Sequence, residues 1–209
     1  YYHTSSDGGA TWGSRQNIIQ DTNRGPHFAV EGDTVVRTEF HEIAYSEVSL
    51  DGGSTWDQTA IQVEDYTAFR DHAVLVAGTN VYIATHWSSS SGSRILKLYR
   101  STDNGSTYQS YNIDDLSGTV SYCDMAMTAD GTLVVCYYDQ SADNLSFGRS
   151  VDDGVTWTTV DTIDQSGHGV GKFCDIAATG DRVFISYFDE TDGALKVARS
   201  LDGGVTWAD

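Results

Sequence analysis

Residues 5–12 read SSDGGATW, and closely related segments follow at four later places in the chain. The other copies are SLDGGSTW (residues 49–56), STDNGSTY (101–108), SVDDGVTW (150–157) and SLDGGVTW (200–207). We call each of these eight-residue segments a box. The boxes recur about every 50 residues, a period that predicts one four-stranded blade of a β-propeller per repeat.

The pattern Ser-x-Asp-x-Gly-x-Thr-Trp predicts a tight hairpin turn. The Asp carboxylate can accept hydrogen bonds from turn amides, and the Gly can adopt a positive φ. The aromatic residue that ends the box is expected to enter the next strand and pack on apolar neighbours. These three roles fall to Asp7, Gly9 and Trp12; Asp51, Gly53 and Trp56; Asp103, Gly105 and Tyr108; Asp152, Gly154 and Trp157; and Asp202, Gly204 and Trp207. Because the turn uses the carboxylate oxygens, we expect the boxes to be structural rather than metal sites.

The segments between the boxes alternate short apolar runs with Gly/Asp turns, which indicates β-strands. Residues 123–150 align with residues 174–200. In one blade the alignment predicts a first strand at 124–128, a second at 133–138 and a third at 145–149. In the next blade the equivalent strands are 175–179, 183–188 and 195–199. A fourth strand begins at the box aromatic. No stretch has a helical period, so the prediction is an all-β propeller of antiparallel blades.

The repeats organise the chain as a single domain over residues 1–209. We expect a partial blade at 1–20, blades at about 21–64, 65–114 and 115–164, and an incomplete last blade at 165–209. In this count the chain begins in a third strand, so third strands outnumber first and second strands by five to four. The prediction is therefore part of a larger propeller, or a ring completed by self-association or by additional blades.

The amino-acid composition excludes several classes of binding partner. The formal net charge is −18 and the pI is near 4.3, so nucleic acid and anionic membranes would be repelled. No apolar run is long enough for membrane insertion. The three cysteines, Cys123, Cys136 and Cys174, are an odd number without zinc-site spacing, and we expect them to be small core residues.

The boxes resemble the Asp-box repeats of sialidases and related bacterial surface propellers. This resemblance implies an extracellular or cell-surface protein whose ligand face lies opposite the boxes. It also implies, for an active sialidase, a Tyr nucleophile with a Glu, an Asp acid/base and three arginines that hold the sugar carboxylate. Only Arg24, Arg70 and Arg94 fall on the expected ligand face, and the family's Arg-Ile-Pro segment is absent.

No catalytic residue is therefore assigned. The leading hypothesis is a non-catalytic propeller module that binds a glycan or a protein or serves as a structural part of a surface assembly. The alternative is a sialidase-like glycoside hydrolase whose site is completed by missing blades.

Aromatic and acidic residues recur where first strands start and second strands end. Rings that stack on sugar C–H groups, beside carboxylates that accept from hydroxyls, suit a neutral-sugar site. The candidates are Arg70, Asp71, His72, His86, Trp87, Asp124, Tyr137, Tyr138, Asp139, Asp175, Tyr187 and Asp189. The same repetition also fits packing between blades. No cofactor or metal is assigned, although the acidic loop at 189–192 could hold Ca²⁺.

Overall fold

The computed structural model describes residues 3–5, 7–15, 27–40, 44–61, 71–88, 94–116, 120–164 and 168–208. These residues form four antiparallel sheets, and they include no helix long and apolar enough to cross a membrane. The first sheet contains β1 (His27–Glu31), β2 (Thr34–Phe40), β3 (Ala44–Ser49) and β4 (Asp57–Ile61); the second contains β5 (His72–Ala77), β6 (Asn80–Ser88), β7 (Arg94–Ser101) and β8 (Gln109–Leu116). The third contains β9 (Val120–Met127), β10 (Leu133–Asp139), β11 (Asn144–Ser150) and β12 (Thr158–Asp164); the fourth contains β13 (Val170–Thr179), β14 (Arg182–Asp189) and β15 (Ala194–Ser200).

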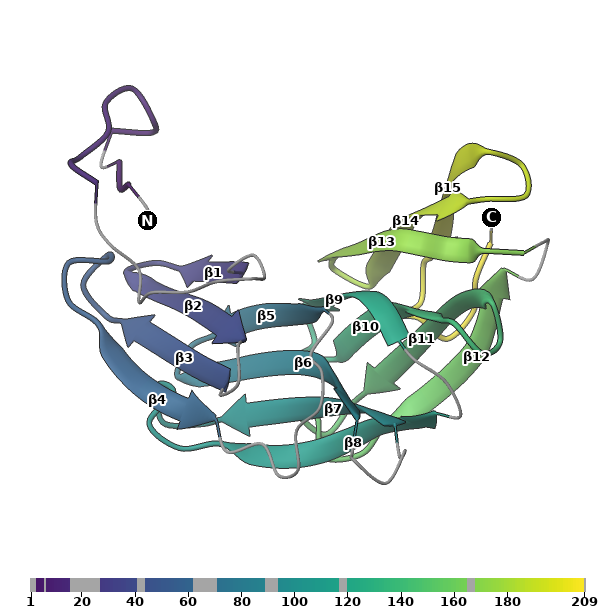
Figure 1. Ribbon diagram of the computed structural model, residues 1–209, viewed down its shortest axis with the longest axis horizontal. Coiled ribbons are helices and arrows are strands. Elements are labelled where there is room, and N and C mark those ends of the chain that lie inside the picture. The colour runs from purple at the N-terminus through teal and green to yellow at the C-terminus, as the bar shows by residue number, and fades with distance from the viewer. Residues whose placement is uncertain are drawn as a thin grey trace.

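The four sheets follow one another around an arc, as blades do in a propeller (Figure 1). The first strands lie on the inner side, where β1 contacts β5, β5 contacts β9, and β9 contacts β13. The fourth sheet has no fourth strand among the described residues. It has only a single bridge between Arg199 and Ala208 at that position.

Burial explains the composition of the strands. From Leu133 to Tyr138 every residue of β10 is buried, because sheets lie on both faces of this strand, and its sequence is accordingly continuous in apolar residues. In β14 only alternate residues are deeply buried, among them Val183, Ile185 and Tyr187. One face of the fourth sheet is thus packed on the third sheet, and its other face is open.

The expected strands are present, with two corrections. The first strands begin earlier than expected, at Val120 and Val170, because the chain enters them through a bulge before Asp124 and Asp175. Val170 and Gly171, at the end of the glycine-rich stretch 167–171, therefore lie in β13. A third strand was also expected at the start of the chain, but residues 3–5 are not part of a strand; within the described part of the chain, their backbone is joined to Gly13 by the bond from Gly13 N to Thr4 O (2.8 Å).

Each box is closed by the same hydrogen bonds. In the fourth box the Asp152 carboxylate accepts from the Thr156 amide (2.8 Å) and hydroxyl (2.6 Å). The Ser150 hydroxyl donates to Asp152 (2.8 Å) and accepts from the Gly154 amide (2.9 Å). Gly154 has a φ of 84°, and the corresponding glycines of the other boxes have φ between 77° and 89°.

The box also joins neighbouring sheets, because its aromatic residue packs on the third strand of the preceding sheet. The Tyr108 hydroxyl lies 2.6 Å from that of Ser46, and the Trp207 ring meets the edge of Phe147 at 4.7 Å between centroids. The expectation of a packed aromatic is wrong for Trp12. This side chain is 64% exposed, because no described sheet precedes the first box.

We predict that Ser150→Ala destabilises the fold by about 1–3 kcal/mol, because it leaves the buried Gly154 amide without its acceptor. Ser5→Ala is the matched control: the same bond in the first box, from Gly9 N to Ser5 Oγ, lies at an exposed turn. Urea unfolding of both variants measures the difference, and an equal loss in the two would contradict a role in joining the sheets.

Candidate functional site

The candidate residues lie at the end of the sheets opposite the boxes. The boxes contact the turns between first and second strands, through bonds such as Gly203 N to Asp181 O (2.7 Å). At the other end, the turn between second and third strands meets the connection entering the next sheet, as where the Gly169 amide donates to Asp143 (2.9 Å). Residues that end second strands and begin first strands therefore share one face of the molecule.

Tyr137 and Tyr187 lie between sheets. Both are fully buried. The Tyr137 hydroxyl donates to Asp114 of the second sheet (2.6 Å), and the Tyr187 hydroxyl donates to Asp164 of the third (2.7 Å). Each tyrosine thus ties the second strand of its sheet to the last strand of the preceding one, and neither ring is available to a ligand.

Asp139 and Asp189 cap the turns that follow their strands. Asp139 accepts from the Ser141 amide (2.8 Å), and Asp189 accepts from the Thr191 amide (2.8 Å) and from Lys196 Nζ (2.6 Å). The hydrogen bond from Lys196 lowers the pKa of Asp189. The ammonium group also lies 3.0 Å from Asp192, so it competes with any Ca²⁺ in the 189–192 loop. The described residues include no group of three or more His, Cys, Asp or Glu side chains arranged to hold a metal ion.

Asp71 and Asp124 lie at the starts of neighbouring inner strands. Asp71 accepts from the His72 amide (3.0 Å), and burial raises its pKa. Asp124 accepts from the Ile176 amide (2.9 Å), and burial raises its pKa to about 6. Asp175 occupies the equivalent place on β13, where its side chain is exposed.

His72 and His86 are buried within the second sheet. His72 Nε2 lies 2.8 Å from the Thr38 hydroxyl, its ring centroid lies 4.1 Å from that of His27 with the ring planes tilted by 47°, and burial lowers its pKa to about 3. Arg70 and the Trp87 side chain lie outside the described part of the structure. The candidates are therefore not one cluster, because most of them hold neighbouring sheets or turns together.

A pair of aromatic rings lies where the third and fourth sheets meet. The Tyr122 and Phe173 rings lie 4.3 Å apart between centroids; Phe173 is 63% exposed, and Tyr122 is half-buried. Both residues have a φ of 57°, a left-handed conformation that bulky side chains rarely adopt. Each lies in a β-bulge of its inner strand, opposite Tyr137 or Tyr187. We call this pair the aromatic platform.

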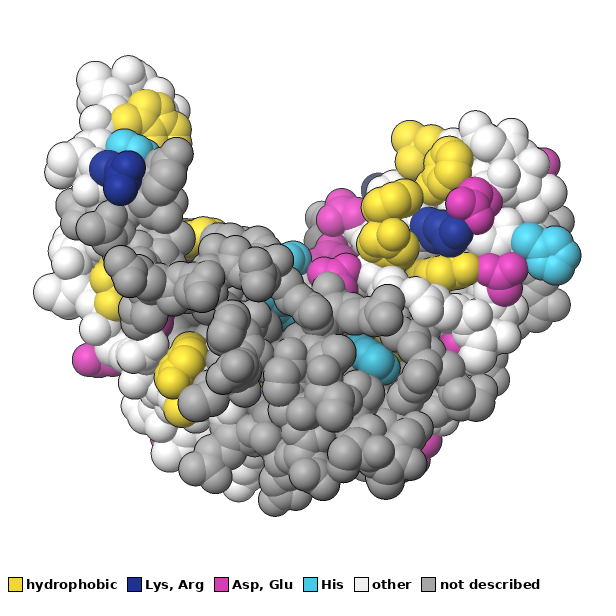
Figure 2. All heavy atoms as spheres, viewed as in Figure 1, with side chains coloured by type: hydrophobic (Ala, Val, Ile, Leu, Met, Phe, Trp, Pro, Cys, Tyr) yellow, Lys and Arg dark blue, Asp and Glu magenta, His cyan; other side chains and the backbone are white. Residues whose placement is uncertain are grey.

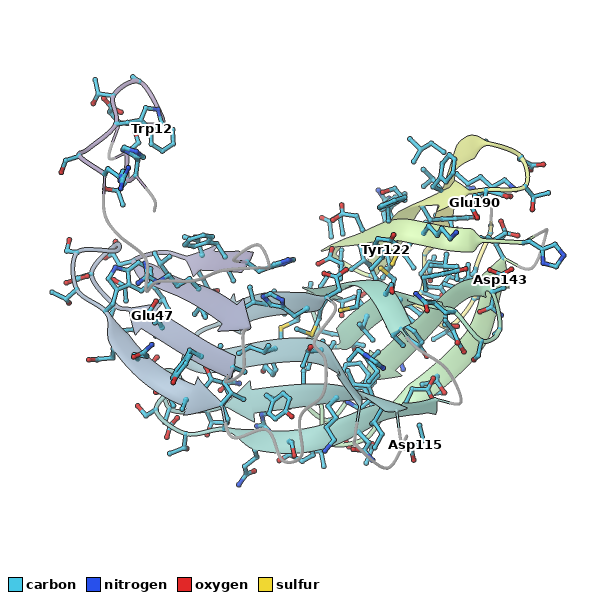
Figure 3. All side chains as sticks on the ribbon, in the orientation of Figure 1. Trp12, Glu47, Asp115, Tyr122, Asp143 and Glu190 are labelled. Atoms are coloured by element: carbon cyan, nitrogen blue, oxygen red, sulfur yellow. The ribbon has the colours of Figure 1, made fainter. Side chains whose placement is uncertain are left out.

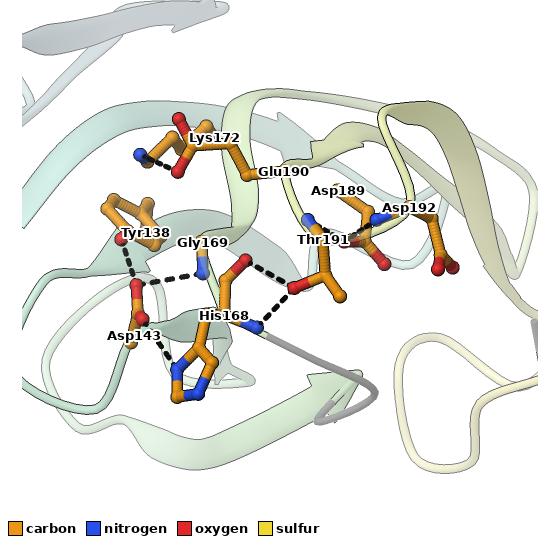
Figure 4. Close-up of polar contacts among 9 residues, drawn as sticks. All are labelled: Tyr138, Asp143, His168, Gly169, Lys172, Asp189, Glu190, Thr191 and Asp192. Atoms are coloured by element: carbon orange, nitrogen blue, oxygen red, sulfur yellow. Dashed lines mark hydrogen bonds and ion pairs between the residues drawn. The ribbon is translucent and has the colours of Figure 1, made fainter.

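The Tyr138 ring lies 6.4 Å from that of Tyr122, and charged groups lie beside it on the same arm of the molecule (Figures 3 and 4). Lys172 Nζ lies 2.5 Å from Glu190 and 5.6 Å from the centre of the Tyr138 ring. Asp143 accepts from the Tyr138 hydroxyl, which lowers the pKa of Asp143, and lies 3.2 Å from His168 Nδ1. Figure 2 shows hydrophobic side chains on this arm of the molecule beside acidic and basic ones.

The sequence-based list includes Tyr138 but omits the other members of this site. These are Tyr122, Asp143, His168, Lys172, Phe173 and Glu190. One signal pointed to the platform: an aromatic residue precedes Cys-Asp in both Tyr122-Cys123-Asp124 and Phe173-Cys174-Asp175. All three cysteines are buried and free.

Three arginines in the described part of the structure make structural contacts away from the expected ligand face. Arg37 pairs with Glu47 inside the first sheet, Arg100 pairs with Asp153, and Arg149 donates to the Gly203 carbonyl (2.9 Å). Arg24 and the Arg94 side chain, like Arg70, lie outside the described part. The placement of Arg24, Arg70 and Arg94 together on the ligand face therefore stays a prediction.

No family model and no curated protein matches the sequence. Among solved structures, the chain is similar to the Hadza microbial sialidase Hz136, with a TM-score of 0.64 and 18% identity over 88% of this chain and 45% of that one. It is similar to Trypanosoma rangeli sialidase in complex with the inhibitor DANA, with a TM-score of 0.64 and 17% identity over 97% and 39% of the two chains. It is also similar to YCF48 bound to D1 peptide, with a TM-score of 0.53 and 16% identity over 96% and 72%.

These likenesses and the sheet arrangement define a β-propeller of the sialidase type. Identities of 16% to 18% establish the fold and not the activity. The chain spans less than half the length of the two sialidases.

We predict a pH effect at Asp124. Its pKa is raised from 3.8 to about 6 in the folded state, so the folded protein binds this proton more tightly than the unfolded chain does. The contribution of Asp124 to stability therefore falls as the pH rises from about 4 to about 6. Asp124→Asn, which can still accept from the Ile176 amide, should remove that part of the dependence. Urea midpoints between pH 4 and 7 test this, and identical profiles for the variant and the unchanged protein would refute it.

Proposed function

We propose that this chain is a non-catalytic, extracellular propeller module that binds a neutral glycan at the aromatic platform. The observation that carries the proposal is the Tyr122–Phe173 pair: both residues have a left-handed backbone, the Phe173 side chain is 63% exposed, and Tyr122 is half-buried against the core between the third and fourth sheets. An exposed ring on a left-handed backbone, as at Phe173, costs free energy, and such strain is concentrated at binding sites. The surface location rests on the resemblance of the boxes to those of bacterial surface propellers.

The platform has the chemistry that a sugar requires. Ring faces stack on the C–H groups of a pyranose, and nearby polar groups bind its hydroxyls. The carboxylates of Asp143 and Glu190 can accept from those hydroxyls, and Lys172 can donate to them. Together with the net charge of −18, the prevalence of carboxylates favours an uncharged sugar over a carboxylated one.

A sialidase-like hydrolase is the second candidate, favoured by the likeness to two sialidases. It would need three convergent arginines beside a Tyr/Glu pair, which the described residues do not contain. The likeness to YCF48 bound to D1 peptide supports protein binding instead, and a peptide that displaces sugar from the platform would identify that role.

We predict that Phe173→Gly abolishes sugar binding while the fold stays intact. Glycine removes the steric penalty of the left-handed φ, which stabilises the folded state by about 1–2 kcal/mol. This gain offsets the extra conformational entropy that glycine gives the unfolded chain, which costs about 0.5–1 kcal/mol of stability. Saturation-transfer NMR with galactose, glucose, mannose and N-acetylglucosamine measures the binding. We expect signals from at least one sugar, and at least a tenfold weaker affinity in the variant.

The matched control is Leu201→Ala, which removes a 60% exposed apolar side chain at the box end of the fourth sheet. It should bind as the unchanged protein does. If no neutral sugar gives a signal, or if both variants bind equally well, the platform is not a sugar site.

We also predict that the 209-residue chain does not hydrolyse sialosides. Between pH 4 and 8, the chain should release the fluorophore from a fluorogenic sialoside no faster than buffer alone does. Turnover that disappears in Arg70→Ala would establish the hydrolase instead.

A further inference from the structure

Two of the three buried cysteines lie in the same apolar core. Cys136 of β10 and Cys174 of β13 belong to the cluster between the third and fourth sheets, together with Phe147 and Ile176. Cys136 is fully buried and Cys174 is nearly so. The two cysteines come from different sheets, so the packing of one sheet on the other decides how their thiols are placed.

Backbone contacts align the two cysteines across the boundary between these sheets. Within the third sheet, Cys136 lies directly opposite Asp124 of β9. The Asp124 carboxylate accepts a hydrogen bond from the Ile176 amide of β13 (2.9 Å), and the Cys174 thiol donates to the Tyr122 carbonyl of β9. Residues 174–176 of β13 therefore lie along residues 122–124 of β9, at the level where Cys136 pairs with β9.

The third cysteine belongs to a different core. Cys123 packs in the cluster between the second and third sheets, and its thiol lies 3.8 Å from the Ala84 carbonyl of β6. Its sulfur is thus directed to the second sheet, whereas Cys136 and Cys174 share the core next to the fourth sheet. The odd number of cysteines therefore resolves into one pair and one single thiol.

The surroundings of the pair keep both thiols protonated in the folded chain. Burial raises the pKa of Cys136, and the neighbouring Cys174 thiol raises it further. Burial also raises the pKa of Cys174. A thiol reacts with a disulfide only as its thiolate, so neither cysteine is reactive once the two sheets enclose it.

We propose that Cys136 and Cys174 form a disulfide when this chain folds in an oxidising environment. The bond joins β10 to β13 and fixes the fourth sheet covalently on the third. It closes a loop that contains β11 and β12, which restricts the unfolded chain and so stabilises the folded one. The extracellular location proposed above is an oxidising environment, in which such bonds persist.

The oxidant is a small disulfide such as oxidised glutathione. The Cys174 thiolate attacks one of its sulfur atoms, a mixed disulfide forms, and one glutathione thiolate leaves. The Cys136 thiolate then attacks the Cys174 sulfur of the mixed disulfide and releases the second glutathione. The protein loses two protons and two electrons, and the oxidant gains them as two thiols. This exchange takes place during folding, before the two sheets enclose the thiols.

Refolding of the full chain from urea tests the proposal, once in a mixture of oxidised and reduced glutathione and once with excess reductant. In glutathione the intact mass should fall by two hydrogens, and peptide mapping should find residues 136 and 174 linked. Alkylation in urea without reductant should then label only Cys123. The oxidised chain should melt roughly 5–10 °C higher than the reduced chain.

The matched control is Cys123→Ala, which removes a buried thiol of the same size and leaves the pair intact. It should keep both the link and the difference in melting temperature, whereas Cys136→Ala and Cys174→Ala should lose both. Mapping of the unchanged chain decides the pairing even where a variant fails to fold. A refolded chain without the link, a link that includes Cys123, or equal melting temperatures of the oxidised and reduced chains would overturn the proposal. None of these results bears on sugar binding.

Discussion

A short hydrogen-bonded turn is the constraint on which the other contacts of this molecule depend. In each box a serine hydroxyl accepts a hydrogen bond from the glycine amide, and the aspartate carboxylate accepts from the threonine four residues after it. The hydroxyl and amide of Thr156 lower the pKa of Asp152 to about 2, so this turn carries a charged acceptor at neutral pH. The glycine can then lie flat against the preceding sheet. The box therefore couples a local turn to the packing between sheets.

That coupling determines which residues remain for a ligand. Tyr137, Tyr187 and Asp124 all have the residue types of a binding site, but their polar atoms bond across sheet boundaries. The aromatic platform differs because the bulge turns Tyr122 and Phe173 out of the strand alternation. The same two bulges lie opposite the buried tyrosines, so the structural contact and the exposed platform arise from one local irregularity.

The sequence predicted the sheets and their turns because both are encoded locally, in boxes and in short apolar runs. It did not predict the platform, since nothing in a single strand shows that an aromatic at position 122 will adopt a left-handed φ and meet position 173. Trp12 differs from the expectation for a related reason: a box aromatic packs on the preceding sheet, and the described residues include no such sheet for the first box. The roles proposed for Arg24, Arg70 and Arg94 stay predictions, because their side chains lie outside the described residues.

The central claim is that the box glycine is sealed against the preceding sheet, and residue-resolved amide hydrogen exchange tests it most directly. The amides of Gly154 and Gly204 should exchange only on unfolding of the sheet interface, whereas that of Gly9, with the same local hydrogen bond, should exchange rapidly. Comparable exchange rates at all three glycine amides would show that the hydrogen bond within the turn protects the amide, and that contact with the preceding sheet does not. The account of how the sheets are joined would then be wrong.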